Sequence, residues 1–248
     1  MGTPLECYDA TASWVAPVIT VDGVGAVLKI GMPHMEAEQE LAGLRFWNGD
    51  PTVRVLDADE HLSAMVLERC EPGTPLRALP EAEQDVVAAN LLRRLWRMPA
   101  VPNPFRPLAV MIQHWTDETR ANQERWPDAG LVRDGLSTFD QLLREPTTEA
   151  LLATDLHAGN VLSAQREPWL VIDPKPFVGD PAYDATQHLL NCFDRLLRDP
   201  RGTIKRFADF LEIDDERVLR WTFARAAAET HDEWDEDWIG LARALGAH

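Results

Sequence analysis

The chain has 248 residues, of which 45% are hydrophobic and 26% charged, an ordinary composition for a globular protein that can bury a substantial core. This composition excludes a fibre and a chain that is disordered throughout. The formal net charge of −17 offers no basic face for the phosphates of a nucleic acid, and it suits solubility or a cationic small-molecule partner instead.

The cysteines and the first ten residues favour a cytoplasmic protein. Cys7, Cys70 and Cys192 are odd in number and widely spaced, which argues against a disulfide framework and a paired zinc site. The opening MGTPLECYDA has neither the basic start nor the apolar stretch of a signal peptide. No apolar run approaches the length of a membrane span, so we expect no membrane partner.

The N-terminal part predicts a small, mostly antiparallel sheet that carries one helix. Residues 13–31 contain two β-rich runs around the turn Asp22–Gly23, which is a hairpin signal. Residues 34–48 are dominated by Ala, Leu and Glu and predict a helix. Two further short strands are predicted in residues 51–57 and 63–70.

The chain after this sheet is predicted to be mostly helical. Amphipathic helices are expected in residues 81–98, 108–126 and 131–144, and helices follow from residue 181 to the end. Residues 150–178 interrupt this pattern with three short strands separated by loops.

The predicted fold class is therefore α+β with two lobes. The N-lobe covers residues 1–70 with its sheet and helix, and residues 71–76, rich in proline and glycine, form a hinge. The helical C-lobe covers residues 77–248. A cleft at the boundary between lobes is a preferred place for a ligand site.

Asp155, Asn160 and Asp173 form the most informative pattern. Asn160 lies five residues after Asp155, and Asp173 lies thirteen residues further. Phosphoryl transfer needs an acceptor for the proton of a substrate hydroxyl and oxygen ligands for magnesium. The spacing matches the catalytic loop and the metal-binding acid of kinases. The alternatives are that Asp155 is merely solvated or caps a helix and that Asp173 is a turn residue before Pro174.

Lys29 is the supporting residue, because a lysine in an apolar strand is unusual without a partner. Glu40, Leu44 and Trp47 share one largely apolar stripe of the next helix. Glu40 is thus placed to pair with Lys29 and hold it against nucleotide phosphates. Glu36 is the competing partner, and a lysine that snorkels from an edge strand is the alternative.

Four sequence blocks resemble the aminoglycoside phosphotransferase family, which has the protein-kinase-like fold, and lie nearest to its streptomycin 6-phosphotransferase and hydroxyurea phosphotransferase branch. They are AVLKIGMPHMEAEQELAGLRFW, MVLERCEPGTPL, TDLHAGNVL and WLVIDPKPFVGDPAYDAT. The likeness runs from about Ala12 to Trp234. It implies transfer of the ATP γ-phosphate, with Mg²⁺, to a hydroxyl of a small-molecule acceptor such as an antibiotic.

The resemblance also implies how the nucleotide is held. By position, Lys29 would contact the α- and β-phosphates of ATP, and Glu40 would orient it. The backbone of Glu68 and Cys70 would hold the adenine. Ser13 would offer its hydroxyl and amide to the phosphates, at the end of a stretch that lacks the family's glycine pattern.

For the transfer step, the resemblance implies that Asp155 is the catalytic base and that Asn160 and Asp173 hold Mg²⁺. Ala153–Thr154 replace the His-Gly that the family usually has before this base. Relatives carry a longer N-terminal extension, so this chain is expected to be naturally short or to have a misassigned start. Asp184 is expected to anchor the catalytic loop from below.

Two other functions compete with an active kinase. One is a catalytically impaired, kinase-like protein that binds nucleotide or regulates a partner. The other is a metallohydrolase with Asp155, His157 and Asp173 as ligands, although a histidine held by backbone hydrogen bonds is the preferred interpretation of His157. The acceptor stays open among streptomycin-like aminocyclitols, hydroxyurea, other antibiotics and ordinary metabolites, as does ATP or GTP as donor.

Residues 229–237 hold six carboxylates. On a predicted helix, Glu229 and Glu236 share one face with Asp232 and Glu233. This face is either simply solvated or an acidic wall for a polycationic acceptor.

Overall fold

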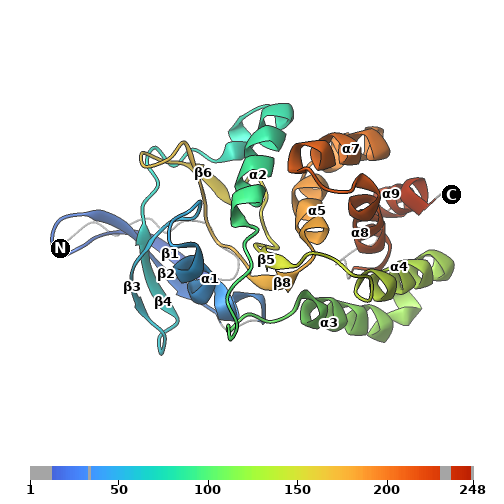
Figure 1. Cartoon of the computed structure of the whole chain (residues 1–248), viewed down its shortest axis with the longest axis horizontal. Helices are drawn as coiled ribbons and strands as arrows, with labels where there is room; N and C mark the ends of the chain where they lie inside the picture. Colours follow the sequence, from blue (N-terminus) through green and yellow to red (C-terminus); the bar gives the residue numbers. More distant parts are fainter. Residues whose placement is uncertain (1–12, 33–34, 230–235, 247–248) are drawn as a thin grey trace.

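The computed structural model of the chain describes residues 13–32, 35–229 and 236–246, and only the backbone of residues 36 and 37. Its N-terminal part is a four-stranded antiparallel sheet in the order β1-β2-β4-β3 (Figure 1). The strands are β1 (Ser13–Ile19), β2 (Gly25–Gly31), β3 (Val55–Asp59) and β4 (Ala64–Glu68). The predicted sheet and its first hairpin are therefore confirmed.

The helix predicted over residues 34–48 is divided. Its described part consists of the 3-10 helix η1 (Met35–Gln39) and the α-helix α1 (Glu40–Trp47), so the prediction of one continuous α-helix is wrong at its start. Gln39 Oε1 accepts a hydrogen bond from the backbone N–H of Arg106 (2.9 Å). This tertiary contact ties the first turns to a distant loop, a constraint that local helix propensity does not contain.

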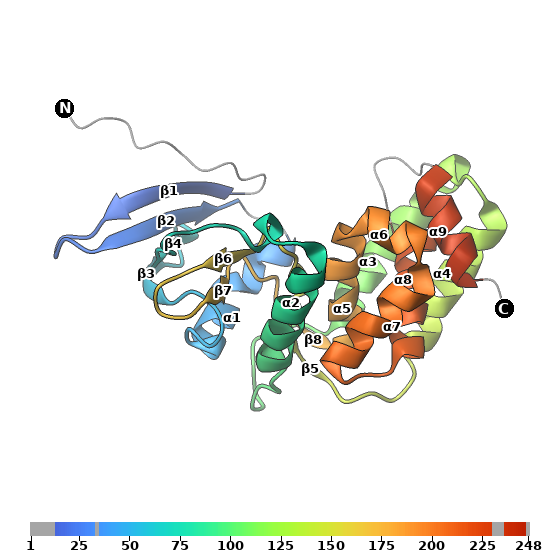
Figure 2. The ribbon, with the colours of Figure 1, turned by 90° about the horizontal axis from the view of Figure 1, so that it is seen from above.

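Helices make up most of the remaining chain and gather on one side of the molecule (Figure 2). They are η2 (Leu76–Ala78), α2 (Glu81–Leu95), α3 (Leu108–Ala121), η3 (Gln123–Arg125), α4 (Ala129–Leu142), α5 (Pro181–Asn191), α6 (Phe193–Arg198), α7 (Pro200–Leu211), α8 (Asp215–Ala228) and α9 (Glu236–Gly246). Within the described ranges, no helix is long and apolar enough to cross a membrane.

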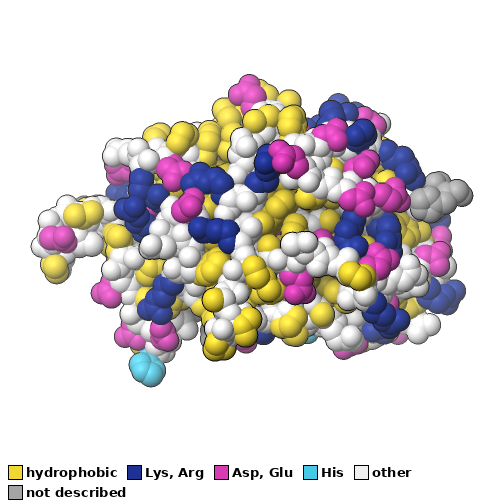
Figure 3. All heavy atoms as spheres, viewed as in Figure 1, with side chains coloured by type: hydrophobic (Ala, Val, Ile, Leu, Met, Phe, Trp, Pro, Cys, Tyr) yellow, Lys and Arg dark blue, Asp and Glu magenta, His cyan; other side chains and the backbone are white. Residues whose placement is uncertain are grey.

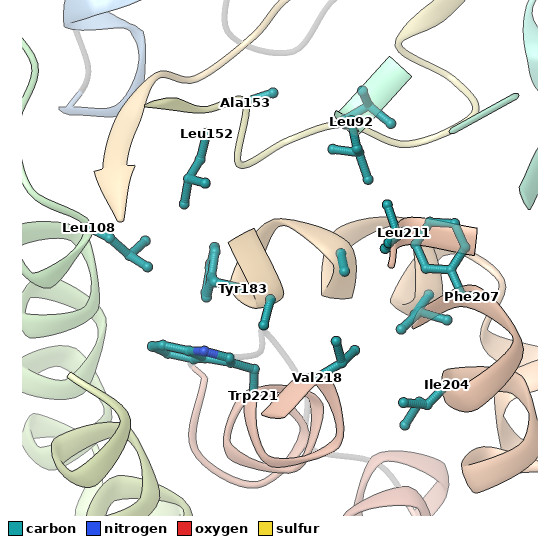
Figure 4. Packing of buried hydrophobic residues seen from close by; sticks show 14 of the residues in the cluster. Leu92, Leu108, Leu152, Ala153, Tyr183, Ile204, Phe207, Leu211, Val218 and Trp221 are labelled. Atoms are coloured by element: carbon teal, nitrogen blue, oxygen red, sulfur yellow. The ribbon is translucent and has the colours of Figure 1, made fainter. Parts of the chain in front are cut away.

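Aspartates begin several of these helices, and aromatic side chains hold them together. Asp128, Asp180 and Asp214 are N-cap residues whose side chains accept backbone N–H groups of α4, α5 and α8. The rings of Tyr183 and Trp221 meet edge to face with centroids 5.2 Å apart, close to the other large side chains of the core (Figure 4). This core fixes α5, on which the site depends.

Four short strands lie between α4 and α5. They are β5 (Ala150–Leu152), β6 (Val161–Ser163), β7 (Trp169–Val171) and β8 (Phe177–Gly179). They pair antiparallel, β5 with β8 and β6 with β7. Three short strands are predicted in this region, so the prediction misses the fourth, β8. A strand of only three residues that follows two prolines carries little strand signal in the sequence, because proline is disfavoured inside strands.

The continuous helix predicted through the acidic residues 229–237 is also wrong. The helix α8 ends at Ala228, and Glu229 has extended backbone angles (φ −72°, ψ 142°). Glu229 therefore lies outside α8 and does not share a helix face with Glu236 of α9. Residues 232 and 233 lie outside the described residues.

Candidate active site

Asn160 and Asp173 lie at the same end of the β6–β7 hairpin. Asn160 immediately precedes β6, and Asp173 follows β7. Val161 pairs with Val171, and the N–H of Ile172 donates to the carbonyl of Asn160 (2.9 Å). The thirteen-residue step from Asn160 to Asp173 is therefore a hairpin, which brings Asp173 back beside Asn160.

The loop that carries Asp155 is anchored by alternate residues. Leu156 and Ala158 are buried in the main core, whereas Asp155 and His157, which alternate with them, are partly exposed. The Nδ2 of Asn160 donates to the backbone oxygen of Asp155 (3.0 Å) and to its Oδ2 (3.1 Å). The two residues of the predicted pattern are thus in direct contact.

The same loop is fastened to the chain just before β8. The N–H of Lys175 donates to the carbonyl of Ala153 (2.7 Å), and the hydroxyl of Thr154 donates to the carbonyl of Lys175 (2.6 Å). Thr154 has a left-handed backbone (φ 45°), which is costly for a β-branched residue. Its hydroxyl bond therefore holds a conformation in which glycine would be unstrained.

Asp184 lies beneath this loop, as expected. Its Oδ2 accepts from the N–H of Ala153 (3.0 Å) and from the indole Nε1 of Trp96 (3.0 Å). Burial raises the pKa of Asp184 to about 6. The side chain joins α5 to the start of the loop that carries Asp155 and is fully buried.

Lys29 connects the sheet to this region. Its Nζ lies 2.7 and 2.8 Å from the two carboxylate oxygens of Glu40 and 2.5 Å from Oδ1 of Asp173. The strand β2 runs between β1 and β4, so the alternative of a lysine snorkelling from an edge strand is wrong. The side chain of the competing Glu36 lies outside the described residues.

The charges in this cluster stabilise one another. Burial alone would lower the pKa of Lys29, but Glu40 and Asp173 raise it above its usual range. Burial would raise the pKa of Asp173, and Lys29 and Lys175 together hold it below its usual value. Burial raises the pKa of Asp155, a change opposed by His157 and Lys175. A carboxylate with a raised pKa is the better proton acceptor.

The donor set at the hairpin end fits Mg²⁺. A carboxylate only accepts hydrogen bonds, so the amide nitrogen of Asn160 must face Asp155 and its oxygen is left for a cation. Both lysine contacts of Asp173 fall on Oδ1, and among the described residues none falls on Oδ2. Carboxylate and amide oxygens are the ligands that magnesium prefers.

The residues predicted to hold the nucleotide lie along the sheet. Ser13 begins β1 two residues before Val15, which is the register partner of Lys29. The carboxylate of Glu68 accepts from Arg166 at 2.9 Å, and its backbone N–H donates to the carbonyl of Arg54 (2.9 Å). The predicted adenine contact of Glu68 therefore falls to its backbone carbonyl. Burial raises the pKa of the Cys70 thiol to about 11, which leaves it neutral. Residues 9–12, which complete the stretch that ends at Ser13, lie outside the described residues.

Asp155, His157 and Asp173 do not form the metal-binding group that the hydrolase alternative requires. The Nδ1 of His157 accepts from the N–H of Gly159 (3.1 Å), the backbone hydrogen bond expected for a structural histidine. In the part of the chain that the structure describes, one group of three potential ligands occurs, Asp85, His188 and Cys192. It lies elsewhere in the C-terminal part, and Arg195 already contacts its carboxylate at 2.7 Å.

Three residues of the site are not predicted from the sequence. Lys175 contacts Asp173, and Gln187 donates from Nε2 to Oδ1 of Asp155 (2.8 Å). Arg225 in turn donates to Oε1 of Gln187 (2.9 Å). The sequence does hold a signal for Lys175, because lysine is rare in this chain. Lys29, Lys175 and Lys205 are the only lysines among its 24 Lys and Arg residues.

Arg225 also accounts for one of the acidic residues predicted to meet a cationic acceptor. Its guanidinium contacts both carboxylate oxygens of Glu229, at 2.5 and 3.0 Å. The arginine is 5% exposed, so the charge of Glu229 is neutralised by a buried partner. The proposed acidic wall therefore loses this member.

The sequence is similar to those of known kinases along most of its length. Residues 2–237 match a family model described as aminoglycoside/hydroxyurea antibiotic resistance kinase. The chain is 38% identical to streptomycin 6-kinase of Streptomyces griseus over 234 residues, which cover 90% of this chain and 75% of that protein. It is 36% identical to hydroxyurea phosphotransferase of Kitasatospora aureofaciens over 237 residues, or 92% and 67% of the two chains.

Solved structures with the same fold are more distant in sequence. An ethanolamine kinase of Plasmodium vivax matches with a TM-score of 0.67 and 14% identity, covering 97% of this chain and 81% of that one. The aminoglycoside phosphotransferase APH(3'')-Id of Streptomyces rimosus matches with a TM-score of 0.60 and 18% identity, covering 96% and 92%. At these identities the likeness establishes the fold alone, and it confirms the predicted protein-kinase-like fold.

Proposed function

Because the chain belongs to the aminoglycoside/hydroxyurea antibiotic resistance kinase family, we propose that it transfers the γ-phosphate of ATP to a hydroxyl of a small antibiotic-like molecule. By their names, the relatives act on streptomycin and on hydroxyurea, and an acceptor of this kind is proposed here. The observation that carries the proposal is the 2.5 Å contact between Lys29 and Asp173, which brings the phosphate-binding candidate of the sheet to the metal-binding candidate.

Asp155 accepts the proton of the acceptor hydroxyl in this proposal. The oxygen of the acceptor hydroxyl forms a bond to the γ-phosphorus. At the same time the bond from that phosphorus to the β–γ bridging oxygen breaks, and ADP leaves with the electron pair. Lys29, held by Glu40, binds the α- and β-phosphates. Magnesium, held by Asn160 and Asp173, would offset negative charge on the phosphates.

The rest of the nucleotide is assigned to the sheet and the segment after β4. The backbone of Glu68 and Cys70 would bind adenine, and Ser13 would contribute a hydroxyl to the phosphates. Cys70 and Cys192 are free thiols, and ATP is an intracellular substrate. We therefore also propose a cytoplasmic protein.

Label transfer from γ-labelled ATP tests the proposal. Purified protein is incubated with Mg²⁺ and a panel that includes streptomycin, other aminoglycosides and hydroxyurea, beside an Asp155→Asn variant. We expect acceptor-dependent labelling that falls at least about a hundredfold in the variant, the usual contribution of a positioned base. ATP binding, followed by calorimetry, should be retained in both proteins.

Two outcomes would contradict this assignment. Full activity in Asp155→Asn would show that Asp155 is not the base. ATP binding without transfer to any acceptor on the panel would favour the catalytically impaired, nucleotide-binding alternative.

A further inference from the structure

Lys175 is a buried cation whose only ion pair among the described residues is with Asp173. The residue is 7% exposed, and its Nζ contacts Oδ1 of Asp173. Lys29 contacts the same oxygen but also holds both oxygens of Glu40. If Asp173 takes another partner, Lys29 therefore still has an ion pair with Glu40, whereas Lys175 has no other ion pair among the described residues.

Asp173 is also a proposed ligand of magnesium. Two ammonium groups and a divalent cation on one carboxylate repel one another strongly in a buried site. If Asp173 turns to the metal, Lys29 keeps Glu40, whereas Lys175 loses its anion. A buried ammonium group without an anion is costly, so Lys175 then requires another negative partner.

The backbone of Lys175 limits where that partner can be. Its N–H and its carbonyl are both hydrogen-bonded to the loop before Asp155, through Ala153 (2.7 Å) and Thr154 (2.6 Å). Its side chain reaches back to Asp173. The ammonium group therefore lies at the proposed metal ligand Asp173, close enough to the proposed base that its charge opposes the rise in the pKa of Asp155. In a kinase the space between these two groups holds the phosphoryl group in transfer.

We propose that Lys175 binds the γ-phosphate of the nucleotide and stabilises the charge of the phosphoryl group during transfer. This inference rests on the proposed function. The two lysines then bind different phosphates, Lys29 the α- and β-phosphates and Lys175 the γ-phosphate alone. A lysine suits a phosphate that moves, because its ammonium group acts as a point charge with rotatable donors.

Calorimetric binding of nucleotides, with Mg²⁺ present, tests the inference without relying on turnover. The proteins compared are wild type, Lys175→Met and Lys29→Met, and the ligands are ADP and the non-hydrolysable ATP analogue AMP-PNP. For Lys175→Met we expect the affinity for AMP-PNP to fall about tenfold or more, as for a lost charge-assisted hydrogen bond, with ADP affinity nearly unchanged. Lys29→Met should weaken both ligands.

Two control variants keep the result interpretable. Lys205→Met, which removes the exposed lysine paired with Asp209 on α7, should leave both affinities unchanged. Lys175→Arg keeps a charge for Asp173 and guards against a fold lost in Lys175→Met. It should retain more of the AMP-PNP affinity than the methionine variant.

The outcomes separate this inference from the proposed function. Equal affinities of wild type and Lys175→Met for AMP-PNP, or an equal loss for both nucleotides, would overturn the role of Lys175 while the kinase assignment stands. If wild-type protein bound neither nucleotide, the proposed function and the inference would fail together.

Discussion

The position of Asp155 depends on one side chain of the kinase-like motif and on others outside it. Gln187 donates to Oδ1 of Asp155 at 2.8 Å, and Asn160 donates to Oδ2 at 3.1 Å. Arg225 can only donate, and it contacts Oε1 of Gln187 at 2.9 Å. The amide nitrogen of Gln187 must therefore face Asp155, and the carboxylate is held at both of its oxygens.

Replacement of Gln187 by Glu should shift the pH dependence of the reaction. The new carboxylate keeps Arg225 as a partner, which preserves the fold, but it places a like charge beside Asp155. Like charge raises the pKa of a carboxyl group, so the base becomes protonated at higher pH. We expect the acidic limb of the kcat profile to move up by about one pH unit, with the KM for ATP unchanged.

The matched control is Gln141→Glu. Gln141 on α4 is exposed and also accepts from an arginine, Arg220, at 3.5 Å. Its kcat profile should coincide with that of wild type. If Gln187→Glu also gave the wild-type profile, Gln187 would have no part in holding the base.

Sequence patterns identify residues more readily than their partners. Asp155, Asn160 and Asp173 could be predicted because one loop and one hairpin fix their spacing. Gln187 and Lys175 could not, because their contacts depend on where α5 and the segment before β8 pack. The pairing of Lys29 with Glu40 was accessible, since helical periodicity places Glu40 on the apolar stripe.

At the scale of elements, Asp184 attaches α5 to the loop that carries Asp155. It accepts from the N–H of Ala153 and the indole of Trp96. Asp184→Asn keeps an oxygen acceptor for these donors but cannot ionise. Asp184→Ala removes the acceptor, and each unsatisfied buried donor costs about 1–3 kcal/mol.

The two Asp184 variants differ in how their stability depends on pH. The folded-state pKa of Asp184 is about 6, above its usual value of 3.8, so the folded protein binds this proton more tightly than the unfolded chain. Its contribution to stability is present below the unfolded pKa and is lost as pH rises from about 4 to 6. Relative to wild type, Asp184→Asn should gain up to about 3 kcal/mol over this range.

Denaturant unfolding of the three proteins at several pH values measures this gain. Asp184→Ala is expected to be the least stable protein at pH 4, where wild type keeps its neutral acid. A stability difference between wild type and Asp184→Asn that stayed constant from pH 4 to pH 7 would show that Asp184 is ionised throughout.

Elements were predictable where periodicity and turn residues are local. The sheet, the hairpin at residues 20–24 and α2 follow from such signals, and Gly23 takes the positive φ of 85° that a turn favours in glycine. The division of the helix over residues 34–48 and the strand β8 were not predictable. They depend on contacts with segments far away in sequence, namely Arg106 and β5.

For the whole molecule, the β6–β7 hairpin joins the two parts of the protein. Leu170 on β7 is buried in an apolar cluster with residues of the N-terminal sheet and α1, and the N–H of Val53 donates to the carbonyl of Val171 (3.0 Å). The hairpin lies between the sheet and α2 (Figure 2). The proposed metal ligands at its end therefore keep their place relative to Lys29.

Charged side chains of both signs are interspersed over the face shown in Figure 3, but they do not contribute equally to stability. Arg166, between β6 and β7, contacts both oxygens of Glu68 at 2.9 Å. It also donates to the carbonyls of Gly49 (2.7 Å) and Thr52 (2.9 Å). Its side chain is only 22% exposed, so solvent screens these contacts little.

Arg166→Met should therefore destabilise the protein by about 3 kcal/mol, the cost of leaving a largely buried carboxylate without its partner. Adding Glu68→Gln should restore part of this loss, because the double variant no longer leaves Glu68 charged. In contrast, Arg45→Met breaks an exposed pair with Glu60, and such pairs contribute less than about 1 kcal/mol. Urea unfolding measures all three, and equal effects of Arg166→Met and Arg45→Met would refute a connection between the two parts through Arg166.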